Sequence, residues 1–386
     1  MSVEAPARVD YRALGRAIAQ EVAGPASAAV DRDARFPREA IDRLKAEGLL
    51  SAMIPVEFGG AGASVADMAA VTEELGMACA SAGMVFAMHQ IQINSLIRHG
   101  RSAALDEFKR EVCRDQLLIA SATTEVGIGG DVRSSLCHVE VEGDSFSVVK
   151  QAPVISYALA ADVLFLTARR TADSPPNDQV LTVLRMDEID LEPTGEWNTL
   201  GFRGTCSPGF VVRGRGLAAL IMDDSYADIS SRSMLPSAHV LWSHLWFGMA
   251  TYAVNQARAF VRSAARSKPG TVPPGAQRLA ELMVVHQQMA DLVHSAAARY
   301  DAVYDDVDAT SSLSFAISMN SLKVSASGLL IDIVGRALVI VGIAGYREDS
   351  PYTLGRLLRD AWGAPLMVNN DRILGNNAQL LLVSKD

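Results

Sequence analysis

The stretch Ala122-Thr-Thr-Glu-Val-Gly-Ile-Gly-Gly-Asp131 decides how the rest of this chain of 386 residues is interpreted. Its glycines allow the backbone to reach positive φ and leave room for something large and flat. The stretch lacks the Gly-Lys-Ser/Thr ending of a phosphate-binding loop, and no strand–turn–helix pattern surrounds it. A β pattern follows: alternating His138-Val-Glu-Val-Glu142, a turn at Gly143-Asp144, then Ser145-Phe-Ser-Val-Val149. The sequence therefore predicts a glycine-rich loop that opens a β region.

Helical patterns lie on both sides of this β region. Residues 11–100 carry apolar side chains at helical spacing, and Ser64 is a suitable N-cap for one of these helices. Further strands are expected at Val163–Ala168 and Val180–Arg185. Four long segments towards the C-terminus predict a four-helix bundle, near 234–267, 275–305, 311–343 and 370–384. We expect an α+β chain in three parts: an N-terminal helical domain (1–116), a middle β barrel or sandwich (117–230) and a C-terminal helical bundle (231–386).

Composition bounds the function. The chain is 49% hydrophobic, which allows a large core, and its net charge of −9 without a basic run argues against a nucleic-acid partner. The four cysteines form no Cys-x-x-Cys pair, so we expect reduced thiols in a cytoplasmic protein and no metal site. The apolar stretch 329–344 is interrupted by Asp332 and Arg336, so we expect a buried helix and no membrane span.

Two motifs resemble those of the acyl-CoA dehydrogenase flavoproteins. Thr124-Glu-Val-Gly-Ile-Gly-Gly-Asp131 resembles their Thr-Glu-Pro-Gly-Ala-Gly-Ser-Asp loop, and Gln151-Ala-Pro-Val-Ile-Ser156 resembles the strand that lies on the flavin. The resemblance covers essentially the whole chain. It implies a helix–β–helix fold, bound FAD, and a homotetramer or homodimer. Against the family pattern, Arg213-Gly-Arg-Gly216 stands where longer strands are usual, which suggests a shortened connection.

The resemblance also implies which residues hold the flavin. Ser156 keeps the hydroxyl that bonds flavin N5 in the family, and Val154 replaces an aromatic wall. Arg266 resembles the arginine that reaches the pyrophosphate from a neighbouring subunit, and Gln277 follows at the family's spacing. The expected cofactor-binding residues are Ala122, Thr123, Thr124, Gly129, Gly130, Val154, Ile155, Ser156, Arg266, Gln277 and Asn370.

The catalytic base of the family is missing. Arg359-Asp360-Ala361 is intact, but the gapless continuation puts Val368 where the family has its glutamate. The position used by other members, on the first bundle helix, corresponds to Ala238. General base catalysis is worth about 10²–10⁴ in rate. We name Asp371 and His239 as candidate catalytic residues; an alternative role for Asp371 is the N-cap of the last helix.

Further residues are expected to line the substrate pocket. Trp242 and Trp246 form an aromatic face at i,i+4 spacing, which suits a bulky, flat or polar substrate. His244 lies about 140° around the helix from His239, so the two histidines need not share a face. Any of these residues can instead be ordinary core. The expected pocket residues are Met84, His89, Trp242, His244 and Val368.

Two enzymatic functions fit these residues. The first is FAD-dependent oxidation of an acyl thioester, on CoA or a carrier protein, with a non-standard base; oxidation at a carbon that bears OH or NH₂ is included. The second is a flavin-dependent monooxygenase that uses O₂ and reduced flavin from a partner reductase. A non-catalytic scaffold is the remaining alternative. The retained loop and the hydroxyl of Ser156 favour the thioester, whereas the lost base and the aromatic face favour oxygenation.

Overall fold

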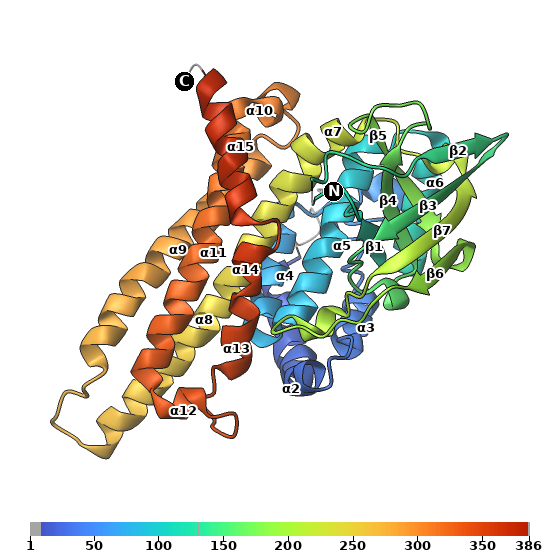
Figure 1. The fold of residues 1–386 in the computed structure, drawn as a ribbon. Helices are drawn as coiled ribbons and strands as arrows, with labels where there is room; N and C mark the ends of the chain where they lie inside the picture. The colour runs from blue at the N-terminus through green and yellow to red at the C-terminus, as the bar shows by residue number, and fades with distance from the viewer. Residues whose placement is uncertain (1–8, 130, 385–386) are drawn as a thin grey trace, which may run out of the picture.

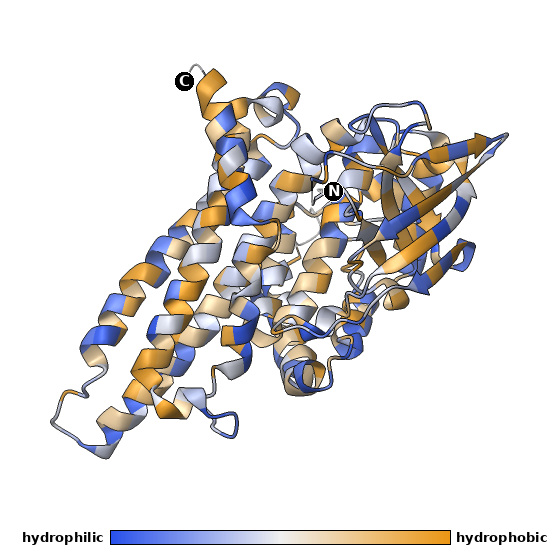
Figure 2. Ribbon diagram, in the orientation of Figure 1, coloured by the Kyte–Doolittle hydropathy of each residue, from blue (hydrophilic) through white to orange (hydrophobic). Residues whose placement is uncertain are grey.

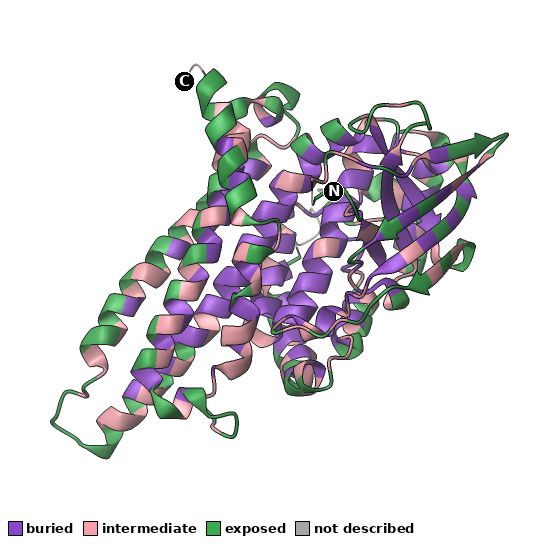
Figure 3. Cartoon of the chain, viewed as in Figure 1, coloured by how far each residue is buried: buried purple, intermediate pink, exposed green. Residues whose placement is uncertain are grey.

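The computed structural model describes residues 9–129 and 131–384, so Gly130, one of the expected flavin residues, lies outside the described residues. The chain forms an N-terminal group of helices, a β region beside it, and a long C-terminal bundle (Figure 1). The arrangement is the expected helix–β–helix fold. Burial is densest where the first and last groups of helices meet and inside the β region (Figure 3).

Six α-helices make up the N-terminal group in the part of the chain that the structure describes. They are α1 (Tyr11–Ile18), α2 (Gly24–Arg32), α3 (Arg38–Ala46), α4 (Val65–Ala78), α5 (Ala80–His99) and α6 (Ala103–Asp115). Ser64 caps α4 as expected: its hydroxyl accepts from the Asp67 backbone N–H, and the Asp67 carboxylate accepts from the Ser64 N–H. α5 is buried along almost its whole length, so this helix lies in the interior of the protein.

The β region consists of two sheets. Its strands are β1 (Ile119–Ala122), β2 (Val139–Glu142), β3 (Ser145–Ala152), β4 (Val163–Arg169), β5 (Gln179–Arg185), β6 (Ile189–Pro193) and β7 (Phe210–Leu217). One sheet has the order β1-β4-β5, with β1 and β4 parallel; the other is antiparallel with the order β2-β3-β7-β6. The first sheet is buried along β4 and β5. The glycine-rich loop leaves this sheet at the end of β1.

The expectation of a shortened connection at residues 213–216 is wrong. These residues lie in the middle of β7, which pairs with β3 on one side and β6 on the other. A Cβ added to Gly214 would lie 2.8 Å from Leu184 Cδ1, so the absence of a side chain lets the two sheets approach closely. The glycine that weakens the strand pattern in the sequence is thus what sheet packing requires.

The C-terminal part is a helical bundle. Its helices are α7 (Tyr226–Ile229), α8 (Leu235–Ser267), α9 (Ala276–Ala302), α10 (Val307–Ser311), α11 (Leu313–Val341), α12 (Ile343–Tyr346), α13 (Gly355–Ala361), α14 (Gly363–Leu366) and α15 (Asn370–Val383). The four long helices α8, α9, α11 and α15 match the four expected segments closely. α8 packs against both α4 and α11, so it joins the bundle to the N-terminal helices (Figure 1).

Among the described residues, α11 is the one helix long and apolar enough to cross a membrane. In this fold it is a bundle helix that packs against α8, α9 and α15, as its apolar residues require (Figure 2). The buried side chains of Asn320 and Lys323 interrupt its apolar sequence. Both find partners in the last segment of the chain, where the candidate active site begins.

Candidate active site

The glycine-rich loop is tied to the strand expected to lie on the flavin. Thr124 Oγ1 donates to the Val154 carbonyl at 3.3 Å, and the Val126 N–H donates to the Gln151 carbonyl at 2.9 Å. Ala122 is buried at the end of β1, whereas Thr123 and Thr124 are half-buried. The loop and residues 151–156 therefore form one surface.

The buried side chain of Glu125 holds this loop in place. Its carboxylate accepts from Ser135 Oγ at 2.7 Å and from the N–H groups of Leu136 and Cys137 at 3.0 and 2.8 Å. Lys150 Nζ lies 3.6 Å away and donates to the Thr167 carbonyl. Burial alone would raise the pKa of Glu125, but the Ser135 hydrogen bond and the Lys150 charge outweigh it and lower the pKa. The anchor is thus a buried, charged network.

The surface that the loop forms with residues 151–156 fits a flavin ring. Gly127 has φ +93°, a conformation that a side chain rarely adopts, and it is exposed, so no Cβ stands between this part of the loop backbone and a ligand. Val154 is 39% exposed and offers an apolar contact, while Ile155 beneath it is buried. Ser207 Oγ donates to Ser156 Oγ at 2.9 Å, which leaves the Ser156 hydrogen free to donate to a ligand atom. These groups supply the donors and the flat apolar wall that a flavin needs.

The N-terminus of α15 lies beside the same loop. Arg372 in its first turn donates to the Gly129 carbonyl, so the last helix and the glycine-rich loop are in direct contact. Asn369, not Asp371, is the N-cap: Asn369 Oδ1 accepts from the Asp371 N–H at 2.7 Å. Asp371 is exposed in that first turn. Val368 has φ +44° and precedes the N-cap of α15, so residues 368–371 do not form a continuous helix.

Lys323 is a buried group hydrogen-bonded to Val368, the position of the missing glutamate. Its Nζ donates to the Val368 carbonyl at 2.9 Å and to Asn370 Oδ1 at 2.7 Å, and it lies 5.9 Å from the centre of the Trp246 ring. The side chain is fully buried, and burial lowers the pKa of Lys323 to about 8. Asn370, expected to bind cofactor, instead uses its amide within the chain: Nδ2 donates to Ser327 Oγ at 3.1 Å.

α8 turns a row of polar aromatic side chains towards Lys323. His239 Nδ1 donates to the Met319 carbonyl of α11 at 3.0 Å, one turn before Lys323, and the ring of His239 lies 6.4 Å from that of Trp242. Burial, together with the Lys323 charge, lowers the pKa of His239 to about 3. His239 is therefore neutral, with Nε2 as its acceptor. A catalytic role for His239 stays a prediction.

The buried carboxylates in the described residues are all bonded to other groups. They are Glu73, Glu74, Glu125 and Asp360. Glu73 and Glu74 pair with arginines of α1, and Asp360 accepts from the Phe202 N–H at 2.6 Å. Because each of these carboxylates is already bonded, none of them is a free base that could take a proton from a substrate next to Val368.

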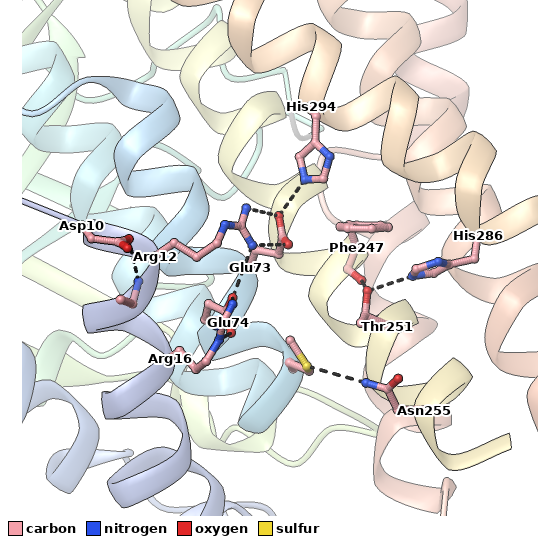
Figure 4. A network of polar contacts seen from close by, with 12 residues as sticks. Asp10, Arg12, Arg16, Glu73, Glu74, Phe247, Thr251, Asn255, His286 and His294 are labelled. Carbon is pink, nitrogen blue, oxygen red and sulfur yellow. Dashed lines mark hydrogen bonds and ion pairs between the residues drawn. The ribbon is translucent and has the colours of Figure 1, made fainter. Parts of the chain in front are cut away.

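His244 belongs to a different cluster. Its ligand atom and those of Glu73 and His294 lie within 4.8 Å of one another, a grouping that can in principle hold a metal ion. However, Arg12 already holds both carboxylate oxygens of Glu73, at 2.6 and 3.1 Å, and His294 Nε2 lies 3.0 Å from one of them (Figure 4). Burial raises the pKa of Glu73, but the hydrogen bonds from His294 and Arg12 outweigh it and lower the pKa to about 2. A cation would be repelled by the guanidinium, so we interpret the cluster as a structural link between α1, α4 and α9.

His89 is likewise structural. Its Nε2 donates to the Leu50 carbonyl at 2.7 Å and its Nδ1 accepts from the Ile119 N–H at 3.0 Å, so both ring nitrogens are used. Burial lowers the pKa of His89 to about 4. The ring fixes β1, and with it the start of the glycine-rich loop, on α5. Met84 is buried in α5 without a polar role.

Arg266 and Gln277 lie far from their expected flavin. Both are exposed at the connection between α8 and α9, at the opposite end of the molecule from the β strands (Figure 1). Gln277 Nε2 donates to Glu281 one turn along α9. The chain's own loop is out of their reach, so a role at the pyrophosphate needs a second copy of the chain.

The three-part fold, with a glycine-rich loop set against the Ser156 hydroxyl in the turn after β3, is shared by flavin-dependent oxidoreductases to which the chain is similar. Two family models match: Acyl-CoA dehydrogenase, N-terminal domain, at residues 7–116, and Acyl-CoA dehydrogenase, C-terminal domain, at residues 236–367. The chain belongs to the acyl-CoA dehydrogenase family. Its relatives include both dehydrogenases and monooxygenases.

The chain is similar to proteins of both of these enzyme classes. A short-chain specific acyl-CoA dehydrogenase from Clostridium acetobutylicum is 23% identical over 369 residues, 91% of each chain. A probable FMNH2-dependent monooxygenase from Pseudomonas putida is 25% identical over 343 residues, 84% of each. Among solved structures, FMN-bound TdsC, a dibenzothiophene monooxygenase from Paenibacillus, has a TM-score of 0.85 at 17% identity and covers 96% of this chain and 97% of its own. Butyryl-CoA dehydrogenase from Megasphaera elsdenii has a TM-score of 0.82 at 18% identity, with 97% of each chain covered.

The sequence did not single out Lys323, Ser207 or Arg372. Lys323 had a signal: it is the only charged residue between Leu313 and Ile331. A lone lysine in an apolar helix is either a mistake in the helix assignment or a group with a buried partner. Ser207 and Arg372 had no comparable signal, because their partners are remote in sequence.

Proposed function

We propose that this protein oxidises an acyl thioester, carried by CoA or a carrier protein, with FAD as its flavin and Lys323 as its base. The observation that carries the proposal is the amine of Lys323 at the backbone carbonyl of Val368, where the family places its glutamate. The reaction is then that of the dehydrogenase relatives, except that Lys323 and not a glutamate removes the proton.

The chemistry of a buried lysine suits this role. A neutral amine has two hydrogens and one lone pair. The Val368 carbonyl and Asn370 Oδ1 accept the two hydrogens, so the lone pair remains for the α proton of the substrate. A pKa of about 8 makes the free amine available near neutral pH.

The other residues bind and orient. The loop at Thr123, Thr124 and Gly129 and the Ser156 hydroxyl would hold the flavin, which supplies the hydride acceptor when bound. Arg266 and Gln277 would complete the pyrophosphate site of a second subunit in a homodimer or homotetramer. Exposed apolar side chains at the far end of the bundle, Ile343 and Tyr346, are 73% and 72% exposed and support such an assembly.

The first test is the visible spectrum. We expect a yellow protein whose flavin band bleaches when an acyl thioester on CoA or on a carrier protein is added without oxygen. The free acid of the same acyl group is the control and leaves the band unchanged. A flavin band that no thioester bleaches would rule the proposal out.

The pH dependence of bleaching is a second test. Burial lowers the pKa of Lys323 from its ordinary value of 10.5 to about 8, so the free amine is scarce below that pH and abundant above it. The bleaching rate should rise about tenfold per pH unit below pH 8 and level off above it. Stopped-flow measurements from pH 6 to 10, at saturating thioester, give the profile. A rate that falls with rising pH contradicts the base role.

Oxygenation is the second candidate, favoured by the aromatic row on α8 and by the bonded state of the buried carboxylates. A monooxygenase would take reduced flavin from a partner reductase and use Lys323 as an ammonium donor. Its rate would then fall as pH rises through about 8, the opposite of the thioester profile. In either function we expect a cytoplasmic enzyme that exchanges electrons with a protein partner.

A further inference from the structure

One face of α8 carries an unusual set of buried polar groups. His239, Trp242, Ser243 and Trp246 stand at i, i+3, i+4 and i+7, the spacing of a single helix face, which we call the polar face of α8. Their exposed fractions are 1%, 8%, 0% and 0%. Within the described part of the chain, His239 Nε2, Trp242 Nε1, Ser243 Oγ and Trp246 Nε1 have no hydrogen-bond partner. Buried polar atoms are nearly always paired, so four unpaired atoms on one face point to a ligand that pairs with them.

The polar face of α8 lies in the candidate active site. Lys323 lies 5.9 Å from the Trp246 ring, and His239 is bonded to the Met319 carbonyl of the same helix as Lys323. A substrate at the amine of Lys323 would thus lie close to two members of the polar face, Trp246 and His239. A plain aliphatic chain would leave all of them unpaired, and that loss opposes its binding.

The donors and acceptors of the polar face narrow the chemistry of the ligand. Each indole offers a donor only, Ser243 offers both, and His239 Nε2 is an acceptor because Nδ1 carries the hydrogen given to Met319. A carboxylate would satisfy the donors and leave His239 unpaired. An ammonium would satisfy His239 and leave the indoles unpaired. A hydroxyl donates to His239 and accepts from Ser243 or an indole, so it matches both kinds of group.

We infer that the acyl group oxidised by this protein bears a hydroxyl close to its reacting carbons, and that the polar face of α8 binds that hydroxyl. The inference rests on the proposed thioester oxidation and names its substrate class. It predicts that hydroxyacyl thioesters are preferred over the corresponding saturated acyl thioesters.

The test compares thioesters that differ by one group. Butyryl-, 2-hydroxybutyryl-, 3-hydroxybutyryl- and succinyl-pantetheine are added to the flavin-loaded protein without oxygen; CoA and carrier proteins share the pantetheine arm. Spectral shifts on binding and bleaching rates are both recorded. We expect one of the hydroxybutyryl esters to exceed butyryl by about 100-fold in rate divided by half-saturating concentration, because butyryl leaves buried donors and acceptors of the polar face unpaired.

Two serine variants of α8 show whether the polar face is responsible. Ser243→Ala should lower the preference for the hydroxyl about tenfold. Ser237→Ala is the matched control, since this buried hydroxyl already donates to the Ser233 carbonyl at 2.6 Å, and it should keep the full preference. Equal effects of the two substitutions would remove the polar face from recognition.

The outcomes separate this inference from the proposed function. Bleaching by butyryl as fast as by the hydroxybutyryl esters, or a preference for succinyl, overturns the hydroxyl inference and leaves thioester oxidation standing. Binding of a hydroxybutyryl ester without any bleaching overturns thioester oxidation and supports the polar face. No spectral shift with any ester overturns both.

Discussion

Lys323→Met should slow the anaerobic bleaching of the flavin by thioester about 10²–10⁴-fold, the loss expected when a general base is removed. Methionine keeps the length and apolar stem of the side chain but cannot accept a proton. Lys323 lies at the Val368 carbonyl and beside the Trp246 ring, so the substitution removes the amine that stands at the position of the missing glutamate. Stopped-flow absorbance at saturating thioester measures the effect on the chemical step alone.

Lys323→Arg separates a base from a positive charge. Arginine keeps the charge at this position and does not lose its proton in proteins. A base role predicts that this variant is as slow as Lys323→Met, whereas a purely electrostatic or structural role predicts that it stays active. Lys109→Met is the control: this buried lysine of α6 donates to the Gly100 carbonyl at the end of α5, and bleaching should be unchanged.

Asp371→Asn addresses the base first considered from the sequence. If Asp371 removes the proton, this substitution abolishes bleaching and Lys323→Met does not. We expect the reverse, because Asp371 is exposed in the first turn of α15 and Val368 breaks the helix before it. The pair of variants thus assigns the proton transfer to one residue or the other.

The elements of the fold were predictable because their signals are local. Short apolar runs mark β4 and β5, and apolar spacing marks the four long bundle helices within a few residues of their observed ends. β7 was the exception: its glycines weaken the strand pattern, and the contact that requires them, with Leu184 of the facing sheet, is invisible in the sequence. Local rules fail where packing between sheets decides.

The candidate site was predictable only in part. The glycine-rich loop and Ser156 were recognised from motifs, whose residues are close in sequence. Lys323 was not, because its partners Val368 and Asn370 are 45 and 47 positions away and meet it only when α15 packs on α11. Asp371 was named from its place near Val368 in the sequence, but in the fold it is exposed in the first turn of α15, after the break that the φ of +44° at Val368 makes. A function that depends on long-range contacts requires the folded chain.

Glu125→Ala should lower the free energy of unfolding by about 3–5 kcal/mol, because it leaves Lys150 as an uncompensated buried charge. It also removes the acceptor of the Ser135 hydroxyl and of two backbone N–H groups that fix the end of the glycine-rich loop. Urea denaturation measures the loss, and titration of the flavin-free variant with FAD should show at least about tenfold weaker binding, since the loop must then be ordered by the flavin itself. Glu142→Ala, an exposed glutamate at the end of β2, is the control and should change neither quantity. If Glu125→Ala unfolds at the same urea concentration and binds FAD as tightly as the unaltered protein, the buried network is not what holds the loop in its binding conformation.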